Sequence, residues 1–153
     1  IFSSPTKRRL RLLGVYGLDV REAGAKIGQA SGLKMCYAAL TKGTAALALE
    51  LMIAAERMGL LDALAGEWEM SQADRYAGFQ MGLPWVPTKA RRWTGEMEEI
   101  AKTFGDAGLR PKIFEGAAEM YRLVGTTALA DETLETFDRE RTLQQVIELL
   151  AKA

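Results

Sequence analysis

Residues 28–37, Gly-Gln-Ala-Ser-Gly-Leu-Lys-Met-Cys-Tyr, are the stretch that decides how this chain folds and where its chemistry is expected. The small residues Gly28, Ala30 and Gly32 lie two apart in front of Lys34, where a long apolar helical pattern begins. Small residues allow a ligand or another backbone to come close. The entrance of a helix carries a positive field that lowers the proton affinity of a lysine, so Lys34 is a candidate acid or base. An ordinary solvated lysine is the simpler interpretation of the spacing alone.

From Ser31 onward the pattern predicts helices alone. The first is expected to have Ser31 as its N-cap and to end near Met58, with Gly59 as a break. Leu40, Leu47, Leu51, Ala54 and Ala55 form an apolar face, and alanines make much of the rest small, so the helix is expected to be buried on most sides. Further helices are expected over residues 60–65, 71–82 (capped by Ser71), 88–104, 111–125 and 133–151, with a proline-containing loop over residues 83–87. The predicted fold class is therefore all-α, a multi-helix bundle.

The beginning of the chain has a different pattern. A short basic helix is expected over Pro5–Tyr16, closed by Gly17, and the alternation of apolar and charged residues over Leu18–Glu22 predicts one strand. A lone helix and strand cannot form a sheet. Because the chain starts at Ile1 without a methionine, we expect it to be a piece of a longer protein.

Composition excludes several classes of function for the residues present. Twenty Lys and Arg balance twenty Asp and Glu, whereas a nucleic-acid binder usually shows a basic excess. There is no histidine and one cysteine, Cys36, so histidine chemistry, a disulfide and a cysteine-based zinc site are excluded, and no metal is expected. Lys42, Glu50, Glu56 and Arg57 are too many charges for a bilayer span, so no membrane is expected.

The segment around Lys34 resembles the catalytic-lysine segment of the β-hydroxyacid dehydrogenase superfamily, which includes 6-phosphogluconate and 3-hydroxyisobutyrate dehydrogenases. The family pattern is Gly-x-Gly-x-x-x-Lys-x-x-Asn-Asn, and Gly28 and Lys34 match it. Ala30 replaces the second glycine, and Tyr37 and Ala38 replace the asparagines. Residues 31–39, Ser-Gly-Leu-Lys-Met-Cys-Tyr-Ala-Ala, look closer to a subgroup of 6-phosphogluconate-dehydrogenase-like C-terminal domains.

This resemblance implies a domain arrangement. Residues 1–24 would be the last helix and strand of a Rossmann-type nucleotide-binding domain whose body lies outside the chain. Residues 25–153 would be a helical substrate-binding and dimerisation domain of the 6-phosphogluconate dehydrogenase C-terminal type. NAD or NADP would be bound mainly by the Rossmann domain of the same protein, so the chain alone is expected to be inactive. A homodimer is also expected from the residues, because the long helix is apolar on more sides than a small monomer can cover.

The resemblance also assigns site residues. Lys34 would be the general acid/base, and Gly28 and Lys34 would lie against the cofactor. Ser31, Gly32 and Tyr37 would contact the substrate. A Lys-Asp pair that the family carries in a later helix falls on Gly95 and Glu96, so its lysine is absent. Three cations just upstream, Lys89, Arg91 and Arg92, are expected to supply one or more ligands for an acidic group of the substrate instead, with Arg92 the first candidate, although a solvated charged face is an equally good interpretation.

The function that follows is a cytoplasmic NAD(P)-dependent oxidoreductase. It would oxidise a small 3-hydroxy acid or a related hydroxy acid, or reduce the keto form, with a lysine as general acid/base. The alternative is a non-catalytic helical module that kept the fold and binds a ligand or a protein. The departures at Tyr37, Ala38, Gly95 and Glu96 favour this alternative, and a Gly-x-Gly-x-x-Gly upstream of Ile1 would favour the enzyme.

Overall fold

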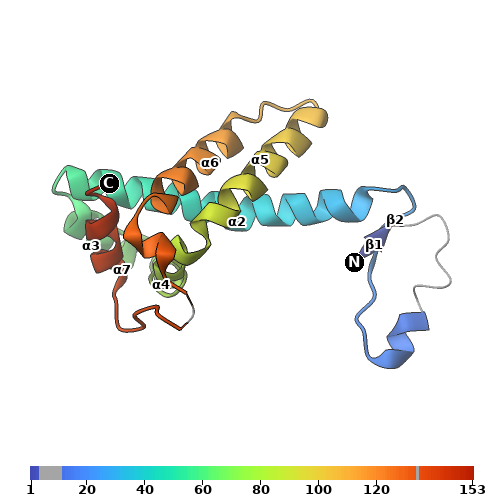
Figure 1. The fold of residues 1–153 in the computed structure, drawn as a ribbon, viewed down its shortest axis with the longest axis horizontal. Coiled ribbons are helices and arrows are strands. Elements are labelled where there is room, and N and C mark those ends of the chain that lie inside the picture. Colours follow the sequence, from blue (N-terminus) through green and yellow to red (C-terminus); the bar gives the residue numbers. More distant parts are fainter. Residues whose placement is uncertain (4–11, 134) are drawn as a thin grey trace.

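The computed structural model describes residues 1–3, 12–133 and 135–153 and confirms the all-α class (Figure 1). The α-helices within these ranges are α2 (Gln29–Arg57), α3 (Leu61–Ser71), α4 (Ala73–Gly82), α5 (Ala90–Asp106), α6 (Lys112–Gly125) and α7 (Leu143–Leu150). Short 3-10 helices are η1 (Leu12–Tyr16), η2 (Leu83–Trp85), η3 (Pro87–Lys89) and η4 (Ala128–Asp131), and the strands are β1 (Phe2–Ser3) and β2 (Glu22–Gly24).

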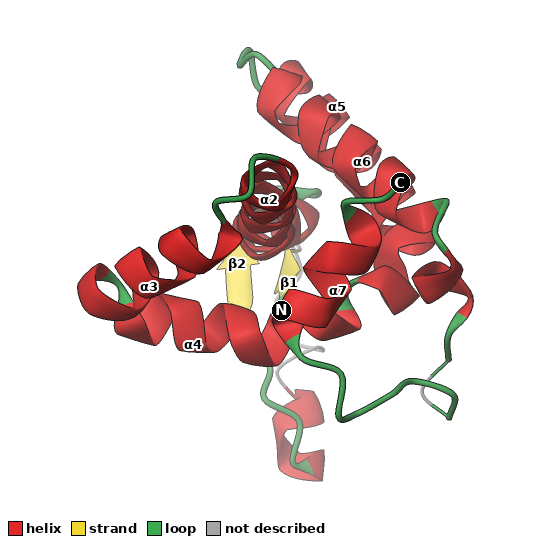
Figure 2. Cartoon of the chain, turned by 90° about the vertical axis from the view of Figure 1, so that its left-hand side faces the viewer, coloured by secondary structure: helices red, strands yellow, loops and turns green. Residues whose placement is uncertain are grey.

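The other helices are arranged around the long helix α2. Seen along α2, the helices α3 and α4 lie on one side of it and α5, α6 and α7 on the other (Figure 2). The helices α5 and α6 pack on each other and on α2, and α7 also contacts α2. Their shared core is made of fully buried side chains, among them Leu49, Met52, Met97, Ile100, Tyr121 and Ile147.

The ends of α2 and α5 lie close to where the glycines predict them. Gly59 follows α2 with a φ of 69°, and the amide of Leu60 donates to the carbonyl of Ala55 at 2.8 Å. Gly108 follows α5 with a φ of 82°, and Leu109 donates to Phe104 at 3.0 Å. This is the Schellman arrangement, in which a glycine in the left-handed region lets the chain satisfy the last carbonyls of a helix.

Both predicted serine caps are wrong. The N-cap of α2 is Gly28, with a φ of 94° and no side-chain cap, so Ser31 lies inside the helix. Gln29 stabilises the preceding turn, because its side-chain oxygen accepts a hydrogen bond from the amide of Lys26 at 2.8 Å. Ser71 ends α3 and donates its hydroxyl to the carbonyl of Glu67 at 2.7 Å. A serine hydroxyl can bond back within a helix as well as cap one, so its presence does not fix a boundary.

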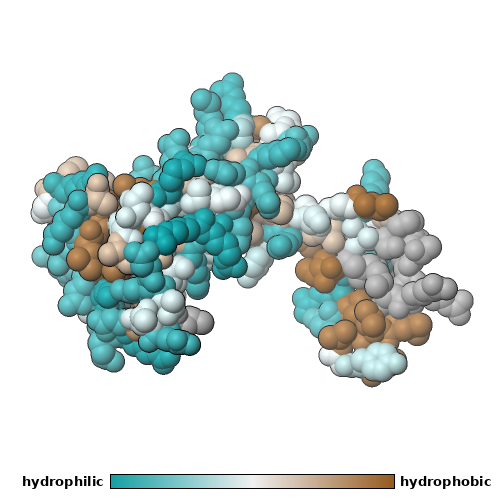
Figure 3. Space-filling view, in the orientation of Figure 1, coloured by the Kyte–Doolittle hydropathy of each residue, from teal (hydrophilic) through white to brown (hydrophobic). Residues whose placement is uncertain are grey.

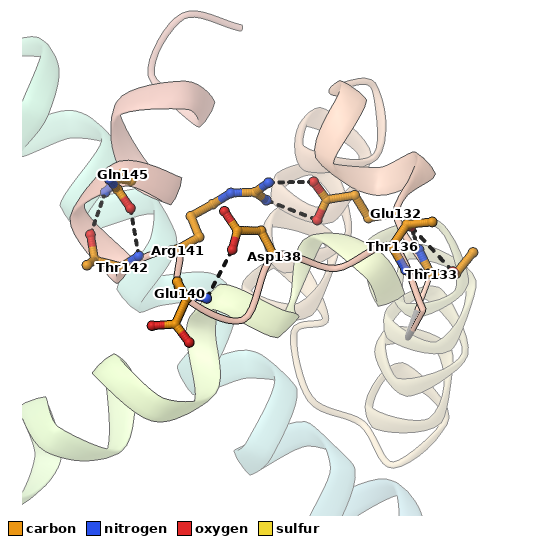
Figure 4. A network of polar contacts seen from close by, with 8 residues as sticks. All are labelled: Glu132, Thr133, Thr136, Asp138, Glu140, Arg141, Thr142 and Gln145. Atoms are coloured by element: carbon orange, nitrogen blue, oxygen red, sulfur yellow. Dashed lines mark hydrogen bonds and ion pairs between the residues drawn. The ribbon is translucent and has the colours of Figure 1, made fainter.

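The predicted helix over residues 133–151 is also wrong. Only Leu143–Leu150 is helical, and Thr142 caps it reciprocally with Gln145. The described residues before it form turns closed by Arg141, whose guanidinium donates two hydrogen bonds to Glu132 (Figure 4). Phe137 is buried, but it does not lie on a helix. Its ring stacks on that of Trp85, with 3.7 Å between the ring centroids. Leu134, which the apolar pattern included, lies outside the described residues.

The first residues lie beyond the free end of α2, away from the bundle (Figure 1). The strand is Glu22–Gly24 rather than Leu18–Glu22, and it pairs in parallel with β1, which the sequence did not predict. Of the basic helix expected over Pro5–Tyr16, residues 5–11 lie outside the described part, and the rest is η1, which buries no residue. The surface over this segment is strongly apolar (Figure 3), with Val15 79% and Tyr16 80% exposed.

The buried face of α2 differs from the predicted one. Ala55 is buried, but Leu40, Leu47, Leu51 and Ala54 are exposed, and the bundle packs on Ala39, Ala46, Leu49, Met52 and Ile53 instead. A helix that is apolar all round does not reveal in its sequence which side faces its own core. By length and composition alone α2 could cross a membrane, a test that the core helix of a soluble protein also passes.

Candidate functional site

Three of the predicted site residues line one pocket beside the start of α2. The pocket has a volume of about 620 Å³ and lies between the β1–β2 pair and the first turns of the helix. Ser31, Lys34 and Tyr37 line it together with Ile1, Arg21, Ala30 and Leu33. The spacing of three residues between Ser31, Lys34 and Tyr37 explains this, because it places them on one face of a helix.

The sequence predicts Lys34 at the entrance of the helix, but in the structure it lies further along α2. Because α2 begins at Gln29, Lys34 lies in its second turn, whereas the field of a helix terminus is concentrated in the first turn. The charge that shares the pocket is Arg21, whose guanidinium hydrogen bonds Asp19 at 2.7 Å and holds the pKa of that carboxyl below its usual value. The two charged residues in the lining are therefore cations, which suits an anionic ligand.

Gly28 and Gly32 have open space where a side chain would lie, and no other part of the chain packs there. A Cβ at Gly28 or Gly32 would meet no other atom within 4 Å. Gly24, one turn earlier, differs: its φ is 146°, and a Cβ there would collide with the carboxamide of Gln29. Backbone at Gly28 and Gly32 is thus accessible to a ligand, while Gly24 is required by the turn itself.

Tyr37 is not a core residue, since 74% of its surface is exposed. Tyr37 lines the pocket, and its carbonyl accepts a hydrogen bond from the hydroxyl of Thr41 at 3.2 Å. Thr41, which shares a helix face with Lys34, is therefore engaged with its own helix. The tyrosine hydroxyl reaches further from the backbone than the asparagine amide of the family pattern would.

Lys89 and Arg92 do not line the Lys34 pocket. They belong to a second cluster, which we call the Trp93 cluster: Lys42, Lys89, Arg92, Trp93 and Glu96. The ammonium groups of Lys42 and Lys89 lie 5.6 Å and 5.8 Å from the centroid of the Trp93 ring. The Glu96 carboxylate forms ion pairs with the ammonium of Lys42 at 2.6 Å and with the guanidinium of Arg92 at 3.6 Å. Two cations pair with the Glu96 carboxylate, and a third, Lys89, lies over the Trp93 ring, so the cluster carries an excess of positive charge that can hold an anion.

Sequence reasoning missed Lys42. It lies on α2 eight residues after Lys34, about 12 Å further along the helix axis. The signal was present, because a charged residue inside an otherwise apolar helix needs a partner when the helix is packed. Its partner is Glu96, and the hydroxyl of Tyr121 donates to the Lys42 carbonyl at 2.6 Å, so both ends of the residue are fixed.

The described residues contain no group of three Asp, Glu, Cys or His side chains that could hold a metal ion. The backbone at Gly28 is open, and it lies just before the residues that line the pocket of about 620 Å³.

Part of the chain is similar to a known protein family. Residues 55–124 match a family described as Domain of unknown function (DUF1932), which is known as the C-terminal helical domain of 6-phosphogluconate dehydrogenase-like proteins. An "Uncharacterized 28.5 kDa protein in 7S RNA 5'region" of Methanothermus fervidus is 28% identical over 123 residues, covering 80% of the chain and 49% of that protein.

A crystal structure of a conserved hypothetical protein from Sinorhizobium meliloti 1021 superposes with a TM-score of 0.73. Its sequence is 24% identical, and the match covers 98% of this chain and 50% of the other. At this identity the likeness concerns the fold. The chain spans about half the length of the relatives that it matches.

Proposed function

We propose that this chain is the C-terminal substrate domain of a cytoplasmic NAD(P)-dependent oxidoreductase that acts on a small hydroxy acid or its keto form. The observation that carries the proposal is the pocket at Lys34, where an amine, two hydroxyl side chains and Arg21 meet at the start of the long helix. The match of residues 55–124 to a dehydrogenase-associated helical domain supports the same assignment.

The division into two domains is part of the proposal. Residues 1–24 belong to a nucleotide-binding domain, and residues 25–153 form the helical domain. Two features support this: β1 and β2 are parallel, as in Rossmann-type sheets, and the apolar side chains of η1 have no core to pack on within the described residues. The relatives, which are about twice as long, have room for such a domain.

A nicotinamide cofactor, when bound, would supply the hydride chemistry, and the open backbone at Gly28 would lie beside it. The residues of this chain transfer the proton and orient the substrate. Lys34 as a neutral amine accepts the hydroxyl proton during oxidation, and as an ammonium it returns the proton during reduction. Ser31 and Tyr37 orient the reacting oxygen, and the open backbone at Gly28 and Gly32 permits close approach of the cofactor and the substrate.

The test uses the full-length protein with Lys34→Ala. Turnover should fall by about two to four orders of magnitude, the usual contribution of a general acid/base. Binding of the nicotinamide cofactor should change little. Lys26→Ala is the matched control, because Lys26 lies in the same segment but not in the pocket lining, and it should keep turnover within a few-fold. Turnover of Lys34→Ala within a few-fold of wild type would remove Lys34 from the mechanism, and a full-length protein that binds acids without turnover would favour a non-catalytic module.

A further inference from the structure

Arg21 borders the Lys34 pocket from outside the helix that carries Lys34. It lies in the extended segment just before β2, and the β1–β2 pair contacts the beginning of α2 (Figure 1). Ser31 and Tyr37 line the same pocket from α2, together with Lys34. Among the lining residues, Arg21 is therefore the polar side chain that α2 does not supply.

Asp19 occupies one edge of the Arg21 guanidinium. Its Oδ2 accepts a hydrogen bond from Nε at 2.7 Å and lies 2.5 Å from Nη2. The two residues are two positions apart in extended chain, which places their side chains on the same side. A guanidinium carries five N–H donors in a planar fork, so the edge formed by Nη1 and Nη2 keeps donors of its own. Within residues 1–3, 12–133 and 135–153, no partner occupies that edge.

The contact with Asp19 orients Arg21 without enclosing it. The side chains of Arg21 and Asp19 are 73% and 68% exposed. An exposed ion pair is weak, because water and salt screen both charges. Asp19 also binds through a single oxygen, whereas a carboxylate that meets a guanidinium edge with both oxygens forms the stronger, bidentate pair. The Nη1–Nη2 edge of Arg21 is therefore the better site for a carboxylate.

Lys34 cannot be the permanent cation of the pocket if it transfers the proton. In the proposed reaction it alternates between a neutral amine and an ammonium, so its charge is absent in one half of the cycle. The guanidinium of an arginine, in contrast, does not lose its proton in a protein. Arg21 therefore supplies a positive charge in both states of Lys34, and a carboxylate bound to it stays in place while the proton moves.

The Trp93 cluster lies outside this pocket. Neither Lys89 nor Arg92 belongs to the pocket lining. Lys42, the member of the cluster on α2, lies about 12 Å from Lys34 along the helix axis. In a small hydroxy acid the carboxylate lies only a few bonds from the reacting carbon, so the cation that binds it has to line the pocket itself. The Trp93 cluster would suit an acidic group further along a longer substrate.

We infer that Arg21 binds the carboxylate of the substrate in the Lys34 pocket, through two parallel hydrogen bonds from its Nη1–Nη2 edge. The carboxylate is then held from the β2 side of the pocket, and the reacting oxygen is held from the α2 side by Ser31 and Tyr37. Two fixed points orient the substrate, which proton transfer to Lys34 requires. This inference rests on the proposed function and adds the residue that selects an acid over a neutral alcohol.

Binding of a small acid tests this role without requiring turnover. The ligands are 3-hydroxypropanoate, the simplest 3-hydroxy acid, and its neutral amide, titrated calorimetrically into the full-length protein with NAD and again with NADP. Wild type should bind the acid more tightly than the amide. Arg21→Met should weaken binding of the acid about ten- to a hundred-fold, the usual effect of losing a charge-assisted pair, and leave binding of the amide unchanged. Arg21→Lys keeps the charge without the fork, so its affinity for the acid should lie between the two.

Lys26→Met is the matched control, because Lys26 is a cation of the same segment outside the pocket lining, and its loss should keep the preference for the acid. Arg21→Met with an unchanged preference overturns the inference, even where Lys34→Ala stops turnover. Wild-type protein that binds the acid no more tightly than the amide overturns it as well. If Arg21→Met loses the preference in a protein that turns over no hydroxy acid, the inference holds and the proposed reaction fails.

Discussion

The ammonium of Lys42 on α2 lies 2.6 Å from the carboxylate of Glu96 on α5. The Lys42 side chain is only 15% exposed, so this ion pair between α2 and α5 is partly buried and holds the two helices together. Arg92 approaches the same carboxylate at 3.6 Å and is 68% exposed. In the Trp93 cluster, Lys42 therefore has a structural role, whereas the exposed Arg92 can reach a ligand in solvent.

The first prediction follows from this division. In the full-length enzyme, Arg92→Ala should weaken the recognition of an acidic substrate and raise its KM. A charge-assisted hydrogen bond contributes about 1.5 to 3 kcal/mol, so kcat/KM should fall roughly ten- to a hundred-fold. The uncharged ester or amide of the same substrate is the control, and its kcat/KM should hardly change. Equal losses for both substrates would mean that Arg92 only supports the fold.

The second prediction concerns alkaline pH. Tyr121 is fully buried, and burial raises the pKa of its hydroxyl above the usual value of 10. Above about pH 10 the unfolded chain releases this proton and the folded chain keeps it, so stability falls as the pH rises. Tyr121→Phe removes this dependence but also the hydrogen bond to the Lys42 carbonyl, which contributes about 1 kcal/mol.

Urea unfolding at two pH values measures this effect. At pH 8, Tyr121→Phe should be less stable than wild type by about 1 kcal/mol. At pH 11 the wild type alone has lost about 1.4 kcal/mol, so the order should reverse and the variant should be slightly the more stable. Tyr16→Phe is the control: this tyrosine is 80% exposed, so its substitution should leave the difference between the two pH values unchanged. A constant stability gap for Tyr121→Phe would mean that Tyr121 ionises in the folded protein as readily as in the unfolded chain.

Local patterns predicted most of the helical fold. The breaks at Gly59 and Gly108 are correct because the left-handed conformation is nearly reserved for glycine, and that preference is visible in sequence. The apolar stripe of α5 is correct at Met97 and Ile100 because charged residues occupy its other side. The pocket at Lys34 follows from helical spacing, since Ser31, Lys34 and Tyr37 share a face.

Features that depend on tertiary contact escaped prediction. The buried side of α2 was wrong because a helix rich in alanine and leucine has no polar face to orient it. The turns before α7 were read as helix because Phe137 and Leu143 fit its period, whereas Phe137 packs on Trp85 from an irregular segment. Lys42 was missed because its partner, Glu96, lies far away in the chain.

The third prediction tests the contact that holds those turns. Arg141 donates two hydrogen bonds to Glu132 at 2.9 and 2.7 Å, and both side chains are largely buried, 17% and 18% exposed. Arg141→Ala should lower the free energy of unfolding by about 2 kcal/mol, because it leaves a largely buried carboxylate without its partner.

The matched control for Arg141 is Arg122→Ala. Arg122 bonds Glu98 at 2.6 Å, but both of these side chains are 56% exposed. Exposed pairs contribute about 0 to 1 kcal/mol, so the control should lose less than half as much stability in thermal or urea unfolding. Similar losses for the two variants would mean that burial does not set the strength of the Arg141 pair.

The last prediction uses one substitution at two glycines, one before α3 and one inside it. Gly59 has a φ of 69°, in the region where an alanine side chain is strained, so Gly59→Ala should destabilise the protein by about 1 to 2 kcal/mol. Gly66 lies inside α3, and a Cβ there would meet no atom within 4 Å, so Gly66→Ala should stabilise the protein by about 0.5 to 1 kcal/mol. Urea unfolding should therefore move its midpoint in opposite directions for the two variants. A stabilising Gly59→Ala would mean that the end of α2 is not held by a left-handed residue.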